Sequence, residues 1–368
     1  MPYRYICPLR DEMKKRLIGL DIAKSVAIFC VIIIHYSFYS QLYSNNLIGN
    51  AVTVFTVIGV PIFFMVNGYL LMNSSFSMNK HIRKTIKMFV VLEVWKVLTL
   101  PCCAVIQEFD IEKKKVPSYL LGGTYDSIGY FWFMNALLAI YLIFPVLKNA
   151  FDDNLGQRYL LYAACGLMVF VFGVNALADA FSVAVKAIGV NISNPFGSLQ
   201  EYNIFGNYSN ALVYFLIGGY LPKIVDKLKS RLKNRLPLVL TVVSSVSYVL
   251  ILLLQRYQAR VDGVAFYVAS GYNNVLVLLM AVSILSLLSG IEVHSERLKN
   301  MWGNSGSNTL GIYYLHYILI ILTSRIIRHW YTGFLPLIIN ILLICCIYIV
   351  GLTISNIMKK IPIVRYIF

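Results

Sequence analysis

The sequence predicts an all-α, polytopic membrane protein that crosses a bilayer about ten times. Hydrophobic residues fill 59% of its 368 positions and charged residues only 13%, and the mean hydropathy is +0.72. A soluble domain carries about twice this share of charge. Apolar runs of about 20 residues, the length that spans a bilayer core, recur along the chain. We expect a single integral membrane domain over residues 1–368.

Each predicted spanning segment is an apolar run of helical length between polar or charged loops. The sixth segment is short. The ten segments cover residues 17–39, 50–72, 86–106, 128–147, 159–178, 208–222, 236–255, 271–290, 307–327 and 334–357.

The loops between these segments alternate in charge. Of 32 Lys and Arg residues, 22 fall on the side of the two termini, eight fall on the opposite side, and Lys24 and Lys96 lie inside helices. This bias predicts that both termini are cytoplasmic in a multi-pass protein of the cell (inner) membrane. The net charge of +16 therefore reflects topology and contact with membrane lipids, and we expect no nucleic-acid partner.

The seven cysteines show neither a disulfide framework nor a metal-binding pattern. Cys102–Cys103 and Cys345–Cys346 are adjacent pairs, and no C-x-x-C or Cys/His ligand spacing occurs. We interpret them as small apolar packing residues and expect no metal cofactor.

The first segment carries the strongest signal for chemistry. Lys24 and His35 are eleven positions apart, so they share a helix face at roughly 16 Å axial separation, and Asp21 lies near the same stripe. Ionisable groups at this depth face a protein interior or a wet cavity. A neutral imidazole accepts a proton from a hydroxyl. From the helix alone, a structural histidine hydrogen-bonded between helices is the competing interpretation.

The third segment adds Glu93 and Lys96, which are three positions apart and can pair. A structural ion pair and a functional role fit equally well, and Glu93 is the first candidate to orient His35. At the start of this segment, Arg83, Lys84 and Lys87 either anchor the topology or clamp the phosphates of an anionic cytosolic ligand.

Other polar residues interrupt apolar segments and are candidates for substrate binding. Trp132 also suits an interfacial anchor, and His316 suits a packed, satisfied side chain equally well. The long polar stretch 179–207 is a candidate lid or acceptor-binding segment. The substrate-binding candidates are Asn67, Tyr69, Trp132, Asn135 and His316.

Five motifs, taken in their order along the chain, resemble those of the acyltransferase-3 family of integral membrane acyltransferases. The strings are RLIGLDIAKSVAIFCVIIIHYSF, IFFMVNGYLL, KHIRKTIKMF, YFWFMNALLAIYLIFPVL and SNTLGIYYLHYIL. The resemblance implies that His35 is the catalytic position and that the charged residue at Lys24 is important. Members usually have Arg there, and often Arg-x-x-Arg where this chain has Lys84-x-x-Lys87. Lysine keeps the positive charge but lacks the planar guanidinium group with which Arg binds a phosphate through two hydrogen bonds.

The resemblance implies an O-acyltransferase that moves an acyl group, most often acetyl, from cytosolic acyl-CoA to a hydroxyl of an extracytoplasmic or lipid-linked glycan. Acetyl-CoA would be the donor. Our own hypothesis is that catalysis involves His35, Asp21, Lys24 and Glu93. His35 acts as general base or takes the acyl group itself before passing it on, and Tyr69, Asn135 or Lys96 stabilises the oxyanion. The alternatives are a transporter or flippase of a lipid-linked sugar or small anion, and a membrane partner or sensor module.

Overall fold

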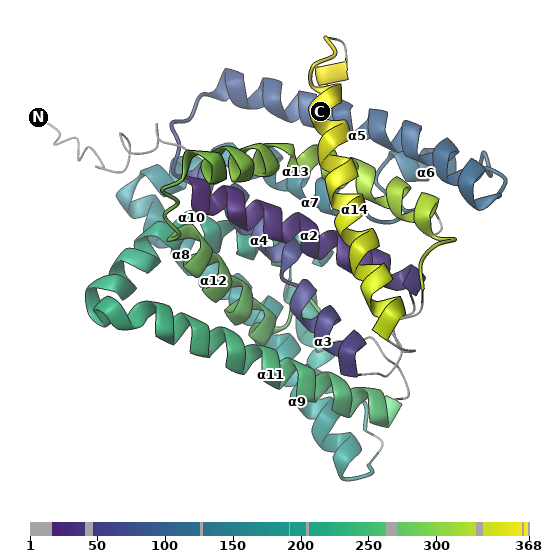
Figure 1. The fold of residues 1–368 in the computed structure, drawn as a ribbon. Coiled ribbons are helices and arrows are strands. Elements are labelled where there is room, and N and C mark those ends of the chain that lie inside the picture. Colours follow the sequence, from purple (N-terminus) through teal and green to yellow (C-terminus); the bar gives the residue numbers. More distant parts are fainter. Residues whose placement is uncertain are drawn as a thin grey trace, which may run out of the picture.

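The computed structural model describes residues 17–40, 47–125, 128–190, 192–203, 206–262, 271–328, 334–362 and 364–366. Helices form nearly all the regular structure of these ranges (Figure 1). One isolated β-bridge there joins Tyr125 and Ile128. The all-α prediction is confirmed. The predicted basic N-terminal cluster, Arg4 to Arg16, lies outside the described residues.

The α-helices overlap all ten predicted segments, but α10 continues to Leu232, ten residues past the predicted end, and α13 begins at Glu296, eleven residues before the predicted start. A π-helical turn, Val169–Gly173, joins α8 to α9. The α-helices are α2 (Ile18–Ser40), α3 (Leu47–Thr56), α4 (Gly59–Met72), α5 (Met78–Gln107), α6 (Val116–Leu120), α7 (Trp132–Asp152), α8 (Asn154–Met168), α9 (Val174–Ala187), α10 (Ser209–Leu232), α11 (Leu236–Asp262), α12 (Val275–Ser289), α13 (Glu296–Thr323) and α14 (Phe334–Met358).

Seven helical runs in the described residues are long and apolar enough to cross a membrane. One of them, Ser209–Gln258, contains two predicted segments, α10 and most of α11. The helix α12 is apolar but shorter. Multiple crossings are therefore supported, while the count of ten and the cytoplasmic termini remain predictions.

The fifth predicted segment is longer in the structure than in the prediction. Helix continues from Asn154 to Ala187, so the first part of the stretch 179–207 is helical. The sequence AFSVAVKA keeps an apolar helical pattern beyond residue 178, and its few polar side chains are exposed or half-buried on α9.

The helix α2 lies in the middle of the assembly, packed by α4, α12, α13 and α14 (Figure 1). It is buried along most of its length, including Asp21 at 4% exposure and Ala27, Ile28 and Ile32 at 0%. Because neighbouring helices surround it, its polar residues face protein and not lipid. This arrangement places the predicted catalytic stripe inside the bundle.

Contacts along α2 fix the directions of its neighbours. Gly306 near the start of α13 abuts Asp21, and the His316 ring further along α13 packs on His35, so α2 and α13 run in parallel. Gly19 at the start of α2 abuts the backbone of Leu288 and Ser289 at the end of α12. The helix α12 is therefore antiparallel, and its first residues lie toward the His35 end of α2.

The helices α4 and α10 cross with their backbones in contact. A Cβ on Gly68 would collide with the carbonyl of Phe215, and a Cβ on Gly218 would collide with the carbonyl of Met65. Only glycine permits this approach, in the manner of small-residue contacts between membrane helices.

Candidate active site

The His35 imidazole lies toward the far end of α2, half-buried among aromatic rings. In the described part of the chain these rings belong to Phe38, Tyr130, His316 and Tyr317, at centroid distances of 5.1–6.3 Å. Within the described part of the chain, His35 has no hydrogen bond and no ion pair. Its ring nitrogens therefore have no partner among these residues.

His316 faces His35 from α13, with ring centroids 5.1 Å apart. It is fully buried, and its Nδ1 lies 2.5 Å from the Tyr313 carbonyl oxygen. A carbonyl only accepts, so Nδ1 carries the proton and Nε2 carries the lone pair in the neutral ring. Among the described residues Nε2 has no hydrogen-bond partner. A buried nitrogen without a partner is unusual and leaves one acceptor in this site.

Three tyrosines, Tyr130, Tyr313 and Tyr317, pack around the two histidines, and we call them the tyrosine cluster. Tyr130 lies 5.2 Å from the His316 ring and stacks on Tyr317 at 5.1 Å. The Tyr313 hydroxyl donates to the Tyr130 carbonyl at 2.6 Å, which ties α13 to the start of α7. The cluster holds both imidazoles in an enclosed, largely apolar setting.

Asp21 and Lys24 pair at the opposite end of the stripe, with Nζ 2.6 Å from Oδ1. Asp21 is 5% exposed and Lys24 is 21% exposed. Lys359, just beyond α14, donates to the Ser307 carbonyl at 2.8 Å. Burial and the nearby Lys24 ammonium both lower the pKa of the Lys359 amine. Two cations and one carboxylate thus lie at this end of α2.

The structure pairs Glu93 with Lys96 and not with His35. The Lys96 Nζ donates to Glu93 Oε1 at 2.8 Å and to the Leu120 carbonyl at 2.9 Å. Lys96 is 1% exposed and Glu93 is 24% exposed. The pair therefore joins α5 to the short helix α6, which matches the structural interpretation of this motif.

Arg83, Lys84 and Lys87 are exposed on the first turns of α5. The Lys84 Nζ lies 5.4 Å from the centre of the Tyr141 ring. The neighbouring His81 is buried, with its Nε2 2.8 Å from the Tyr141 carbonyl. The contacts of His81 and Lys84 anchor the start of α5 on α7 and leave the three cationic groups toward solvent.

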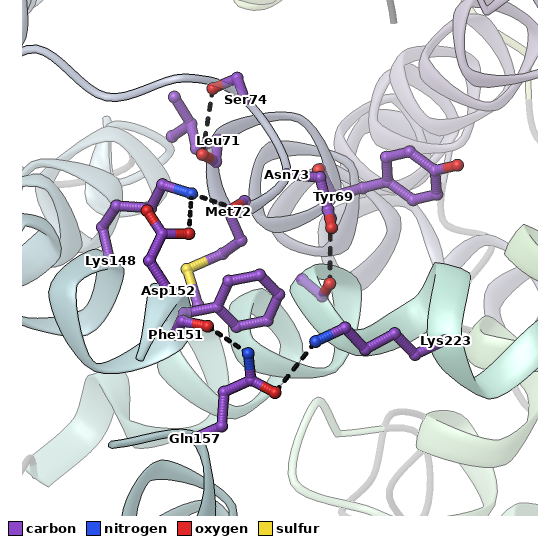
Figure 2. Close-up of polar contacts among 11 residues, drawn as sticks. Tyr69, Leu71, Met72, Asn73, Ser74, Lys148, Phe151, Asp152, Gln157 and Lys223 are labelled. Carbon is purple, nitrogen blue, oxygen red and sulfur yellow. Dashed lines mark hydrogen bonds and ion pairs between the residues drawn. The ribbon is translucent and has the colours of Figure 1, made fainter. Parts of the chain in front are cut away.

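The structure does not bring Asn67 or Tyr69 to His35. Asn67 donates to the Phe63 carbonyl of its own helix at 2.9 Å. Tyr69 lies one turn before Asn73, which bridges the Tyr69 and Gly219 carbonyls. Figure 2 shows the Tyr69 ring directed away from the nearby pair of Lys148 and Asp152. This part of α4 is built for contact with α7 and α10.

Trp132 and Asn135 lie at the start of α7, close to the tyrosine cluster in sequence. The Trp132 ring packs on Tyr272 at 5.5 Å and on Tyr208 at 6.4 Å. The Asn135 amide donates to the Gly122 carbonyl at 3.1 Å, which satisfies one of its polar groups. Both residues lie at the end of α7 that carries Tyr130.

The arrangement can support proton transfer. Within the described ranges, no group of three or more His, Cys, Asp and Glu side chains gathers as a metal site would require.

Comparison with known proteins gives one match: the model of the family described as "Acyltransferase domain", acyltransferase-3, covers residues 17–359. The chain belongs to the acyltransferase-3 family. Comparisons with curated proteins and with solved structures find no match.

Membership of the acyltransferase-3 family confirms the resemblance predicted from the motifs, while the individual roles of the site residues stay predictions. Sequence reasoning placed His316 among the substrate-binding residues and missed the tyrosine cluster. The string YYLHY around His316 carried a signal, because it puts two of the three tyrosines beside a histidine. Nothing in the sequence joined Tyr130 to them.

Proposed function

We propose that this membrane acyltransferase moves an acyl group, most often acetyl, from cytosolic acyl-CoA to a hydroxyl of an extracytoplasmic or lipid-linked glycan. The observation that carries the proposal is the juxtaposition of His35 and His316, one half-buried and one fully buried. An enclosed pair of imidazoles suits proton transfer to and from an alcohol.

In this proposal His35 acts as the general base. It takes the proton of the acceptor hydroxyl while the oxygen attacks the thioester carbonyl. The carbon–sulfur bond then breaks, and the protonated His35 returns the proton to the CoA thiolate, which leaves as the thiol. The products are an O-acyl ester and CoA. His316, with its Nδ1 hydrogen-bonded to Tyr313, packs on the His35 ring and holds it in place, and its Nε2 would accept a hydrogen bond from the protonated His35.

The donor would approach from the end of α2 that carries Lys24. Lys24 and Lys359 together outweigh Asp21 in charge there, and an anionic CoA is attracted to such a surface. The rise of roughly 16 Å between Lys24 and His35 suits an extended pantetheine arm. Arg83, Lys84 and Lys87 would bind the phosphates as separate point charges. The inner membrane, with both termini in the cytoplasm, is the location that this proposal requires.

The positions of the other predicted residues refine their roles. Glu93 and Lys96 serve as a structural pair, since each satisfies the other. Trp132 and Asn135 lie on the acceptor side, beside the tyrosine cluster. The rival function, a carrier for a lipid-linked sugar or small anion, is not favoured by membership of an acyltransferase family.

Membrane vesicles with and without the chain test this function directly. Acetyl-CoA labelled in the acetyl group should pass its label to glycan in vesicles that contain the chain, with free CoA released in equal amount. A carrier would accumulate label in the lumen without consuming thioester. Intact thioester in both preparations would overturn the proposal.

A further inference from the structure

A cavity of about 360 Å³ lies between α9, α11 and the start of α12, separate from the residues around His35. This volume falls within the range of ligand pockets, about 300–1,000 Å³. Ala176, Ala180 and Ala184 line it at four-residue intervals on one face of α9. Their short side chains leave the space that larger residues on this face would fill.

Two hydrogen-bond acceptors of this cavity have no donor among the described residues. The Asp179 carboxylate is half-buried and has no hydrogen bond or ion pair with the residues that the structure describes. The Oε1 atom of Gln258 is buried, also without a partner in this part of the chain. A buried acceptor without a donor costs about 1–3 kcal/mol. A ligand rich in donors would satisfy both groups.

The charge of the cavity selects among such ligands. The side-chain oxygen of Asn274 caps α12 by accepting from the Leu276 backbone N–H at 2.8 Å. This backbone N–H is therefore not free to bind an anion. Asp179 adds a negative charge, which disfavours phosphates and carboxylates. A neutral sugar combines hydroxyl donors on its edges with apolar C–H faces. Those faces match the aliphatic wall of the three alanines, Val183 and Leu254.

The cavity lies at the His35 end of the bundle. The helix α12 runs antiparallel to α2, so its first residues, which line the cavity, lie toward that end. Tyr272, two positions before Asn274, packs on Trp132. Tyr130, two positions before Trp132, packs on His35 at 6.1 Å. Two half-buried rings, Tyr272 and Trp132, and the buried Tyr130 thus lie between the cavity and the imidazole pair.

We propose that this cavity binds a neutral, hydroxyl-rich sugar unit of the acceptor, with Asp179 and Gln258 as its hydrogen-bond acceptors. The proposal rests on the proposed function, because it assigns the acceptor of that reaction to a place. A sugar held here would extend across Tyr272 and Trp132 and present another hydroxyl to His35. The same cavity would reject the anionic donor.

Octyl β-D-glucoside, a neutral sugar on an alkyl chain, is a suitable probe for the full chain in lipid nanodiscs. Two variants alter the cavity: Ala180→Phe fills it, and Asp179→Asn keeps its volume but removes the charge. Leu177→Phe, on the exposed side of α9, is the matched control. We expect the Kd for the glucoside to rise at least tenfold in Ala180→Phe, severalfold in Asp179→Asn, and not at all in Leu177→Phe.

Transfer assays separate this inference from the proposed function. In Ala180→Phe, the KM for the glycan should rise at least tenfold, with the KM for acetyl-CoA unchanged. Equal glucoside binding by Ala180→Phe and the unaltered chain would overturn the inference, as would equal competition by octanol, which would mark a pocket for a lipid tail. If the unaltered chain consumes no acetyl-CoA yet binds the glucoside in the cavity, the proposed function fails while the sugar site stands.

Discussion

His35 and His316 face each other across two parallel helices, with ring centroids 5.1 Å apart. They lie 281 positions apart in the sequence, and His35 is half-buried while His316 is fully buried. The buried member has a fixed Nδ1 and a free Nε2 among the described residues. In the proposed function, this asymmetry favours His35 for contact with substrate and His316 for support of His35.

His35→Ala should remove the general base and lower acyl transfer by about 10²–10⁴-fold. The variant should still fold, because His35 has no hydrogen bond to lose within the described residues. Label transfer from acetyl-CoA to glycan measures the effect, with thermal unfolding as the check on folding. His294→Ala, at an exposed loop histidine, is the control and should transfer normally. Full activity of His35→Ala would rule out its catalytic role.

His316→Asn tests the positioning role. The Asn amide can still donate to the Tyr313 carbonyl, but it has no counterpart of Nε2. We expect kcat to fall about tenfold or more, the KM for both substrates to stay unchanged, and the acidic limb of the pH–rate profile to move. A purely structural role would instead lower thermal stability and leave the pH profile of the remaining activity where it was.

Replacing Arg83, Lys84 and Lys87 together by Gln should weaken binding of the anionic donor. We expect the KM for acetyl-CoA to rise about tenfold or more and its dependence on salt to flatten, because exposed charges act through a screened field. Lys227, Lys229 and Arg231 on α10 form the matched control, since they are equally basic and exposed. An equal effect of both triple variants would show that general surface charge, and not a phosphate site, sets the KM.

Glu93→Gln should destabilise the protein more than the double variant Glu93→Gln/Lys96→Met. The single change keeps an amide oxygen that can still accept from the Lys96 ammonium, but it removes the negative charge beside this group, which is 1% exposed. A buried charge that loses its counter-charge costs about 1–3 kcal/mol or more. Thermal unfolding in detergent measures both variants. If Glu93→Gln unfolds normally but abolishes transfer, Glu93 acts in catalysis and the structural interpretation is wrong.

Gly68→Ala should destabilise the crossing of α4 and α10, because its Cβ would overlap the Phe215 carbonyl. Overpacking of this kind costs about 1–3 kcal/mol. Gly166→Ala in α8 is the control, since nothing lies within 4 Å of its added Cβ, and helix propensity favours Ala by about 1 kcal/mol. Thermal unfolding should therefore move in opposite directions in the two variants.

Most of the fold was predictable because apolar length and loop charge are local signals. The helices overlap the predicted segments, and the errors at residues 179–187, at the end of α10 and at the start of α13 arose because polar and charged positions masked a continuing helix. The stripe of Asp21, Lys24 and His35 follows from helix geometry alone. The contact of His35 with His316 does not, because helical periodicity says nothing about which distant helix packs on a given face.

The same limit explains Glu93 and the cavity. Glu93 was the only carboxylate besides Asp21 well inside a predicted segment, so it was the natural partner for His35, yet its ammonium neighbour three positions away satisfies it first. Asp179 drew no attention in a predicted loop. Its significance depends on α11 and the start of α12 closing a cavity around it, which is a tertiary property.

The glycine contact between α4 and α10 constrains how this protein can move. Because the backbones touch at Gly68 and Gly218, these two helices have little room to move against each other. Rocking of one bundle half against the other, on which alternating-access carriers depend, cannot hinge at this seam. We therefore expect the thioester and the alcohol to travel through the membrane interior to a stationary centre.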